Sequence, residues 1–157
     1  MRWLRQWWPA LCWAAVIWAF STEHFSSAAT SRVIEPLLRW LFSSASPRTV
    51  RYIHHVIRKA AHVTEYFVFS LMLFRAFRGK ERGWRITWMV EAIVVAAFYA
   101  GLDEVHQAFV PGREARWQDS MLDTLGAAIG QLVLWMWFRQ KSKSQERVAA
   151  QGLQEKS

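Results

Sequence analysis

Ionisable side chains interrupt the apolar parts of this sequence at spacings that bring them together on a helix. Arg58, His62 and Glu65 are four and three residues apart, so they share one helical face, and Lys59 and Tyr66 flank it. An imidazole beside a carboxylate can ligate a metal or move a proton, whereas guanidinium and ammonium groups bind phosphate. This segment therefore predicts a polar site for one of these chemistries.

Two more groups of polar residues follow later in the chain. Asp103 and Gln107 share a face of one helix, with Glu104 beside them, and Asp119 and Asp123 share a face of the next. Ionisable groups within apolar helices are expensive to bury, so they generally face a cavity and pair with one another. We therefore expect both groups to lie at the same end of the fold as the first.

Three kinds of site fit these residues, and the sequence leaves the choice open. In the first, Arg58, Lys59 and Arg113 bind a phosphate or pyrophosphate, with a tight turn at residues 110–113 aiming Arg113 into the cavity. In the second, His62 and the acids hold a divalent cation or act as general acid and base. In the third, opposite charges pair and only neutralise each other. The candidate catalytic residues are His62, Glu65, Asp103, Glu104 and Asp119.

Four apolar segments must position these residues, and they cover residues 7–20, 60–77, 86–102 and 120–138. Their pattern predicts helices, since membrane strands would need sustained alternation and a closed barrel. A membrane-crossing helix needs about 20 residues, so flanking residues must extend each span. The predicted fold is a bundle of four transmembrane helices, and the alternative is a soluble bundle with buried core helices. Gly126 and Gly130 are expected to allow close helix packing within the bundle or between protomers.

Tryptophan and basic residues indicate how these helices are oriented in a membrane. The N-terminus, residues 75–85 and the tail are basic, whereas residues 103–119 are net acidic. The positive-inside rule then predicts cytoplasmic termini, although the connection before residue 60 is also basic. The net charge of +8 is thus mainly an orientation signal, and nucleic acid is not an expected partner. An aromatic belt on the same side would comprise Trp3, Trp7, Trp8, Trp84, Trp88, Trp135 and Trp137.

The connection between the first two spans has helical signals of its own. Apolar residues recur at helical spacing over residues 33–42, which predicts an amphipathic helix at the membrane interface or on the bundle. Residues 43–47 break the chain, and a second helix begins near Val50 and runs into the second span. The first span contains bulky Trp13 and Trp18, which favour a retained anchor over a signal peptide cleaved near residues 26–28. We divide the chain into a membrane domain, 1–139, and a polar cytoplasmic tail, 140–157.

Three segments resemble motifs of the VanZ-like family. Residues 58–66, RKAAHVTEY, are similar to its R-K-x-x-H-x-x-E-Y motif, and residues 103–113, DEVHQAFVPGR, to its D-E-x-x-Q-x-F-x-P-G-R motif. Asp119 with residues 123–126 resembles a D-x-x-x-N-x-x-G element, in which Asp123 stands where Asn is commonly found. Ser21 and Thr22 match the polar exit of the first span. The resemblance extends from about residue 13 to residue 138.

This resemblance implies a role in the cell envelope, because the family is named for a protein associated with resistance to the glycopeptide teicoplanin. It implies an all-α protein of the bacterial cytoplasmic (inner) membrane, with four transmembrane helices and an extracytoplasmic interfacial helix. Expected partners are the lipid bilayer, an anionic lipid or lipid-linked envelope precursor, and a second copy in a homodimer. The alternatives are a hydrolase or transferase acting on a phosphate-bearing lipid head group, with or without a divalent metal, and a transporter. The expected ligand-binding residues are Ser21, Thr22, Arg58, Lys59, Tyr66, Gln107, Arg113 and Asp123.

Overall fold

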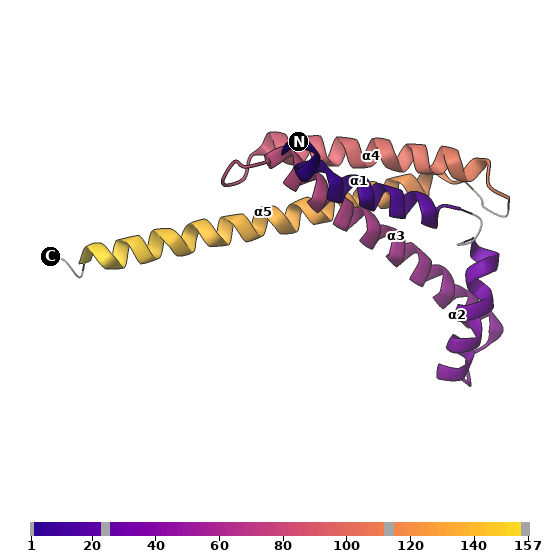
Figure 1. Cartoon of the computed structure of the whole chain (residues 1–157). Coiled ribbons are helices and arrows are strands. Elements are labelled where there is room, and N and C mark those ends of the chain that lie inside the picture. The colour runs from indigo at the N-terminus through magenta and orange to yellow at the C-terminus, as the bar shows by residue number, and fades with distance from the viewer. Residues whose placement is uncertain (1, 23–25, 112–114, 155–157) are drawn as a thin grey trace.

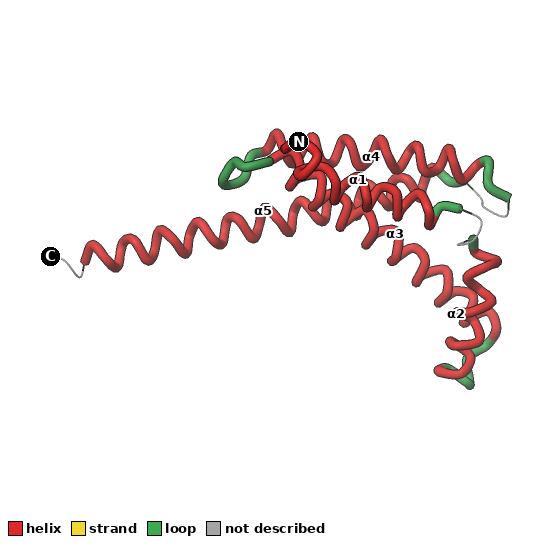
Figure 2. The backbone as a smooth tube through the Cα atoms, viewed as in Figure 1, coloured by secondary structure: helices red, strands yellow, loops and turns green. Residues whose placement is uncertain are grey.

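The computed structural model of the chain describes residues 2–22, 26–111 and 115–154, and within these ranges all regular secondary structure is α-helical (Figure 2). The helices follow in the order α1 (Arg2–Phe20), α2 (Ser27–Leu41), α3 (Pro47–Arg78), α4 (Ile86–Ala108) and α5 (Trp117–Gln154). The predicted all-α class is therefore confirmed. Arg113, one of the expected phosphate ligands, lies outside the described residues.

Four helices form a bundle in which α3 and α5 run parallel to each other and antiparallel to α1 and α4. α3 packs against α1, α4 and most extensively α5 (Figure 1). Trp7, near the start of α1, packs edge-on against Phe77, near the end of α3, with ring centroids 5.0 Å apart. Phe74 contacts Trp88, near the start of α4, and Phe138 of α5. The opposite end of the bundle therefore holds the end of α1, the end of α4, the start of α5 and the middle of α3.

Small residues bring the helices of the bundle close together. Ala92, Ala96 and Ala100 recur every four residues on α4 and are fully buried. On α5, a Cβ atom at Gly126 would lie 2.5 Å from the carbonyl oxygen of Val63 in α3, and one at Gly130 would also clash with α3. The close packing expected of Gly126 and Gly130 thus occurs within the bundle.

The connection between the first two spans forms a helical hairpin that points away from the bundle (Figure 1). Ser46 caps the start of α3 by accepting a hydrogen bond from Thr49, and Pro47 occupies the first turn, so the predicted break and restart are confirmed. α2 packs on the first half of α3 and buries Leu38, but it leaves Val33 and Trp40 exposed. The hairpin therefore combines packing on the fold with a free apolar face.

Two helices among the described residues are long and apolar enough to cross a membrane: Ile86–Ala108 and Trp117–Arg147. The sequence predicts four such helices, and two helices among the described residues meet the criteria of length and composition. α3 is long enough at 32 residues, but its first half carries the charges Arg58, Lys59 and Glu65. α5 continues without a break beyond residue 139 and projects from the bundle as a single helix (Figure 1).

Basic and aromatic side chains gather at the end of the bundle that holds the start of α1. An open cleft there lies between the α3–α4 loop and residues 135–145 of α5. The cations stack on aromatic rings at distances of 4.8–5.8 Å from the ring centroids, in the pairs Arg85–Trp88, Arg139–Trp135, Lys141–Trp137 and Arg78–Phe138. This arrangement matches the aromatic, basic side that the sequence predicts.

Candidate functional site

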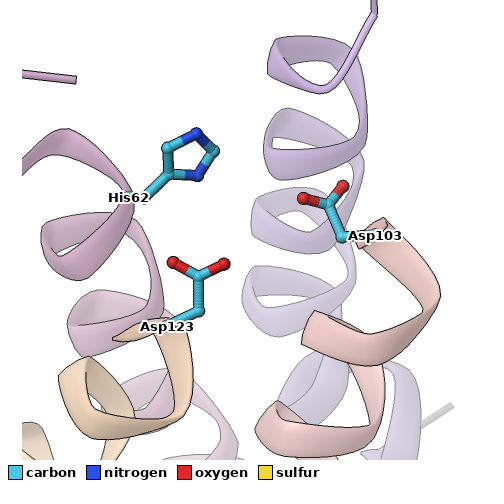
Figure 3. A group of neighbouring side chains, drawn as sticks. All are labelled: His62, Asp103 and Asp123. Carbon is cyan, nitrogen blue, oxygen red and sulfur yellow. The ribbon is translucent and has the colours of Figure 1, made fainter. Parts of the chain in front are cut away.

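The other end of the bundle contains a cluster of buried polar side chains from three helices. His62 of α3, Asp103 of α4 and Asp123 of α5 each direct a donor atom into a shared space, and these atoms all lie within 4.8 Å of one another (Figure 3). Asp103 and Asp123 are only 1% and 2% exposed, and His62 is half-buried. We call these three residues the inner triad. The expected convergence of separate segments on one layer is therefore observed for all three.

Two neighbours hold the inner triad in position. Gln107 lies one turn after Asp103 on α4, and its Nε2 donates a 2.7 Å hydrogen bond to Asp103 Oδ2. Glu65 Oε2 lies 3.7 Å from His62 Nδ1, so this carboxylate interacts electrostatically with the imidazole. The backbone of Glu65 is fixed in turn by Trp13 of α1, whose Nε1 donates to the Glu65 carbonyl oxygen at 2.9 Å. The pairs that the spacing placed on one helical face, Asp103 with Gln107 and His62 with Glu65, are therefore also close in space.

Several buried polar atoms in this cluster have no hydrogen-bond partner among the described residues. They are Asp103 Oδ1, Asp123 Oδ1 and the hydroxyl of Tyr66, whose side chain is fully buried. The hydroxyl of Tyr66 lies in the neighbourhood of both aspartates and Glu65. Buried polar groups in proteins are nearly always hydrogen-bonded, so a group of such atoms in one place requires an explanation.

A second layer of charges lies closer to the end of the bundle. Lys59 Nζ donates to Asp119 Oδ1, which ties α3 to the start of α5, and Asp119 also interacts electrostatically with half-buried Arg58. Glu104 Oε2 accepts a 2.7 Å hydrogen bond from the backbone N–H of Arg116. One oxygen of Glu104 therefore orders the segment that leads into α5.

The polar exit of α1 has its own partner. Ser21 is buried, and its Oγ lies 3.2 Å from Nδ1 of His106, whose ring stacks on Trp18. Thr22 donates to the carbonyl oxygen of Ala19 within the same helix end. His106 thus faces α1 and not the triad, which agrees with its position on another face of α4. Ser21 thus links the end of α1 to α4, and the ligand-binding role expected of Ser21 and Thr22 stays a prediction.

His54 holds the α2–α3 hairpin together. It is buried, and its Nε2 lies 3.2 Å from the hydroxyl of Thr30 in α2. Burial is the main reason that its pKa lies below the ordinary value of 6.5, and the adjacent charges of Arg58 and His55 lower it further, while Glu35 opposes them. A neutral imidazole is therefore favoured in the folded hairpin.

One buried polar residue falls outside all of the predicted sites. Gln131 of α5 is fully buried, and its Nε2 donates a 2.8 Å hydrogen bond to the carbonyl oxygen of Ser70 in α3. A carboxamide inside an apolar segment is the signal that could have identified it, because polar groups at membrane depth require internal partners. Its contact joins the same two helices as Gly126.

The balance of charge decides what this end of the bundle can bind. Five acidic side chains from three helices gather here, namely Glu65, Asp103, Glu104, Asp119 and Asp123, whereas the described basic side chains are Arg58, Lys59 and, where the chain enters α5, Arg116. Lys59 is already paired with Asp119. The inner triad is therefore suited to a cation, and Arg58 at the rim is suited to an anion.

The fold and this site define an all-α bundle that buries an acid-rich cluster with one histidine at one end. The sequence model of the family described as VanZ/LLP1 matches residues 7–139. The chain therefore belongs to the VanZ/LLP1 family, as the motifs predicted. No curated protein and no solved structure matches the chain.

Proposed function

We propose that this chain is an integral membrane protein whose polar cluster, at the outer face of the bacterial cytoplasmic membrane, engages an anionic lipid or a lipid-linked cell-envelope precursor. The observation that carries the proposal is the position of the cluster, at one end of a bundle whose outside is apolar. Through such a ligand the protein would influence the access of glycopeptides such as teicoplanin to the envelope, in line with its family.

Exposed apolar surface supports the membrane setting. In each of the two long apolar helices only 28% of the most apolar window is buried inside the protein, whereas the core helix of a soluble protein would be mostly buried. The exposed side chains of α4 include Val94, Phe98 and Val105, and those of α5 include Met121 and Leu125. An exterior on which large apolar side chains predominate is the surface that lipid requires.

The length of α3 supports a third span. Between Lys59 and Arg78 this helix rises about 28 Å, at 1.5 Å per residue. The hydrocarbon core of a bilayer is about 30 Å thick, so the two cations would reach its opposite boundaries. The inner triad would then lie one turn inside the outer boundary, and the basic, aromatic end would face the cytoplasm, with four spans and both termini inside.

The ligand class follows from the residues at the rim. Arg58 is half-buried beside the cluster, where a guanidinium group can form two hydrogen bonds to a phosphate. Lys59 would add a second charge once an anion competes with Asp119. The acids below would repel the same phosphate, unless a cation lies between them.

Lipid binding by the purified full chain tests the proposal. Native mass spectrometry in detergent would compare phosphatidylglycerol, a polyprenyl pyrophosphate and phosphatidylcholine as the neutral reference. We expect anionic lipids to be preferred and Arg58→Gln to weaken their binding at least 10-fold. The matched control is Arg51→Gln, which removes an exposed charge two turns earlier on α3. Equal binding by both variants and the wild type would contradict the proposal.

A second candidate function is a membrane hydrolase or transferase that acts on a phosphate-bearing lipid head group. The donor set of the inner triad favours it, because an imidazole and two carboxylates can position a metal that activates water. Incubating the protein with the same lipids and Zn²⁺, Mn²⁺ or Mg²⁺ tests it. Turnover that Asp103→Asn abolishes would support an enzyme, and absence of turnover with every metal would leave the binding function.

A further inference from the structure

The inner triad has the composition and geometry of a metal site. It offers one imidazole nitrogen and two carboxylate oxygens, each from a different helix, within 4.8 Å of one another. Three donors that are 4.8 Å apart lie about 2.8 Å from their common centre, whereas ligands lie about 2.1 Å from an ion. Side-chain movements of about 0.7 Å would therefore bring all three donors into contact with one ion (Figure 3).

A second observation points to the same ligand. Asp103 Oδ1, Asp123 Oδ1 and the Tyr66 hydroxyl have no hydrogen-bond partner in the described part of the chain, and all three side chains are at least 98% buried. Two carboxylates with oxygens this close repel each other in a medium of low polarity. A divalent cation would satisfy these oxygens and cancel the repulsion in one step.

The neighbours of the triad act as an outer shell. Gln107 donates to Asp103 Oδ2, so Oδ1 is the oxygen that remains without a hydrogen-bond partner among the described residues. Glu65 interacts with His62 at Nδ1, the ring nitrogen that it would orient, and thereby favours Nε2 as the ligand. Metal-binding histidines and carboxylates are commonly positioned by contacts of this kind.

We propose that His62, Asp103 and Asp123 bind a divalent cation of the Zn²⁺ or Mn²⁺ type, with Tyr66 beside it and a coordination position left for a phosphate oxygen. The mixed nitrogen and oxygen set favours these ions over Ca²⁺, which takes six to eight oxygen ligands. The inference rests on the proposed function for the phosphate-bearing ligand, whereas the cation site rests on the side chains alone. The ion would bridge the acidic triad and an anionic head group.

Metal binding by the full chain in detergent micelles tests this inference. After treatment with a chelator and its removal, isothermal titration with Zn²⁺ and Mn²⁺ should detect one site per chain. Asp103→Asn, Asp123→Asn and His62→Gln should each weaken binding at least 10-fold, and His62→Gln changes a position that is only partly buried, where folding is less at risk. Glu91→Gln is the control, because it removes an exposed carboxylate from α4 and should bind like the wild type.

The outcomes separate this inference from the proposed function. Failure of Zn²⁺ and Mn²⁺ to bind the wild type, or equal binding by all three triad variants and Glu91→Gln, would overturn the cation site. Metal binding without anionic-lipid binding would leave the site intact and refute the proposed function. Lipid binding that persists unchanged in EDTA and in Asp103→Asn would uphold the proposed function and refute the bridging role.

Discussion

Replacing Gly126 with alanine should separate α5 from α3 and disturb the triad. A Cβ atom there would lie 2.5 Å from the Val63 carbonyl oxygen and 3.1 Å from two more backbone atoms of Val63. These are backbone atoms, so no change of rotamer can relieve the clash. Ordinary contact begins at 3.4 Å, so the helices must move apart locally by about 0.9 Å.

The size of the effect follows from two opposing contributions. Overpacking of this kind costs about 1–3 kcal/mol, whereas alanine gains about 0.5–1 kcal/mol over glycine within a helix. The net loss is at most about 2.5 kcal/mol, which for a chain of this length lowers Tm by up to about 10 °C. Metal binding by the triad should be affected more strongly than stability. Asp123 lies one turn before Gly126 and His62 adjoins Val63, and metal–ligand distances tolerate deviations of only about 0.2 Å.

Thermal unfolding in detergent, followed by the fluorescence of the 11 Trp residues, measures the first effect, and Zn²⁺ titration measures the second. Gly101→Ala is the matched control, since a Cβ at that helical glycine meets nothing within 4 Å. Its Tm should stay level or rise. If Gly126→Ala were as stable as Gly101→Ala and bound Zn²⁺ like the wild type, the close contact would not position the triad.

Three further predictions concern other contacts. Tyr99→Phe removes the 2.7 Å hydrogen bond to the Ala14 carbonyl oxygen and should lower the free energy of unfolding by about 1 kcal/mol in an SDS titration. In the wild type, the free energy of unfolding should fall as the pH drops below 6.5. The pKa of His54 is lower in the folded chain, so the unfolded chain binds the proton at a higher pH and gains stability first. His54→Gln should flatten this pH profile. Asp119→Asn should strengthen the binding of anionic lipid several-fold, since it releases Lys59 from its ion pair, and unchanged affinity would exclude Lys59 from the site.

The elements of this fold were predictable from local signals. The spacing of apolar residues identified the helices, and the Ser and Pro residues around position 46 marked the break before α3, because capping and ring geometry act within one turn. Same-face spacing also grouped Asp103 with Gln107, which hydrogen-bond directly. These features depend only on residues that are near one another in the chain.

The distribution of the site residues between two layers could not be predicted in this way. Asp123 lies in the inner triad while Asp119, one turn earlier, pairs with Lys59. Glu104 turns toward the N–H of Arg116, although it adjoins Asp103 in the sequence. These differences depend on how far each helix is rotated about its own axis. Close contacts at small buried residues such as Ala96 and Gly126 set that rotation, and residue spacing within one helix does not reveal it.

α5 runs without interruption from the triad into the polar tail. It packs on α3 as far along as Phe138, which contacts Phe74 and Arg78, and Gln154 lies about 24 Å beyond that contact, at 1.5 Å per residue. A pull on the tail would therefore be resisted at Phe138, which lies 15 residues after Asp123 in the same helix. The carboxylates are in this way anchored against movements of the projecting part of α5.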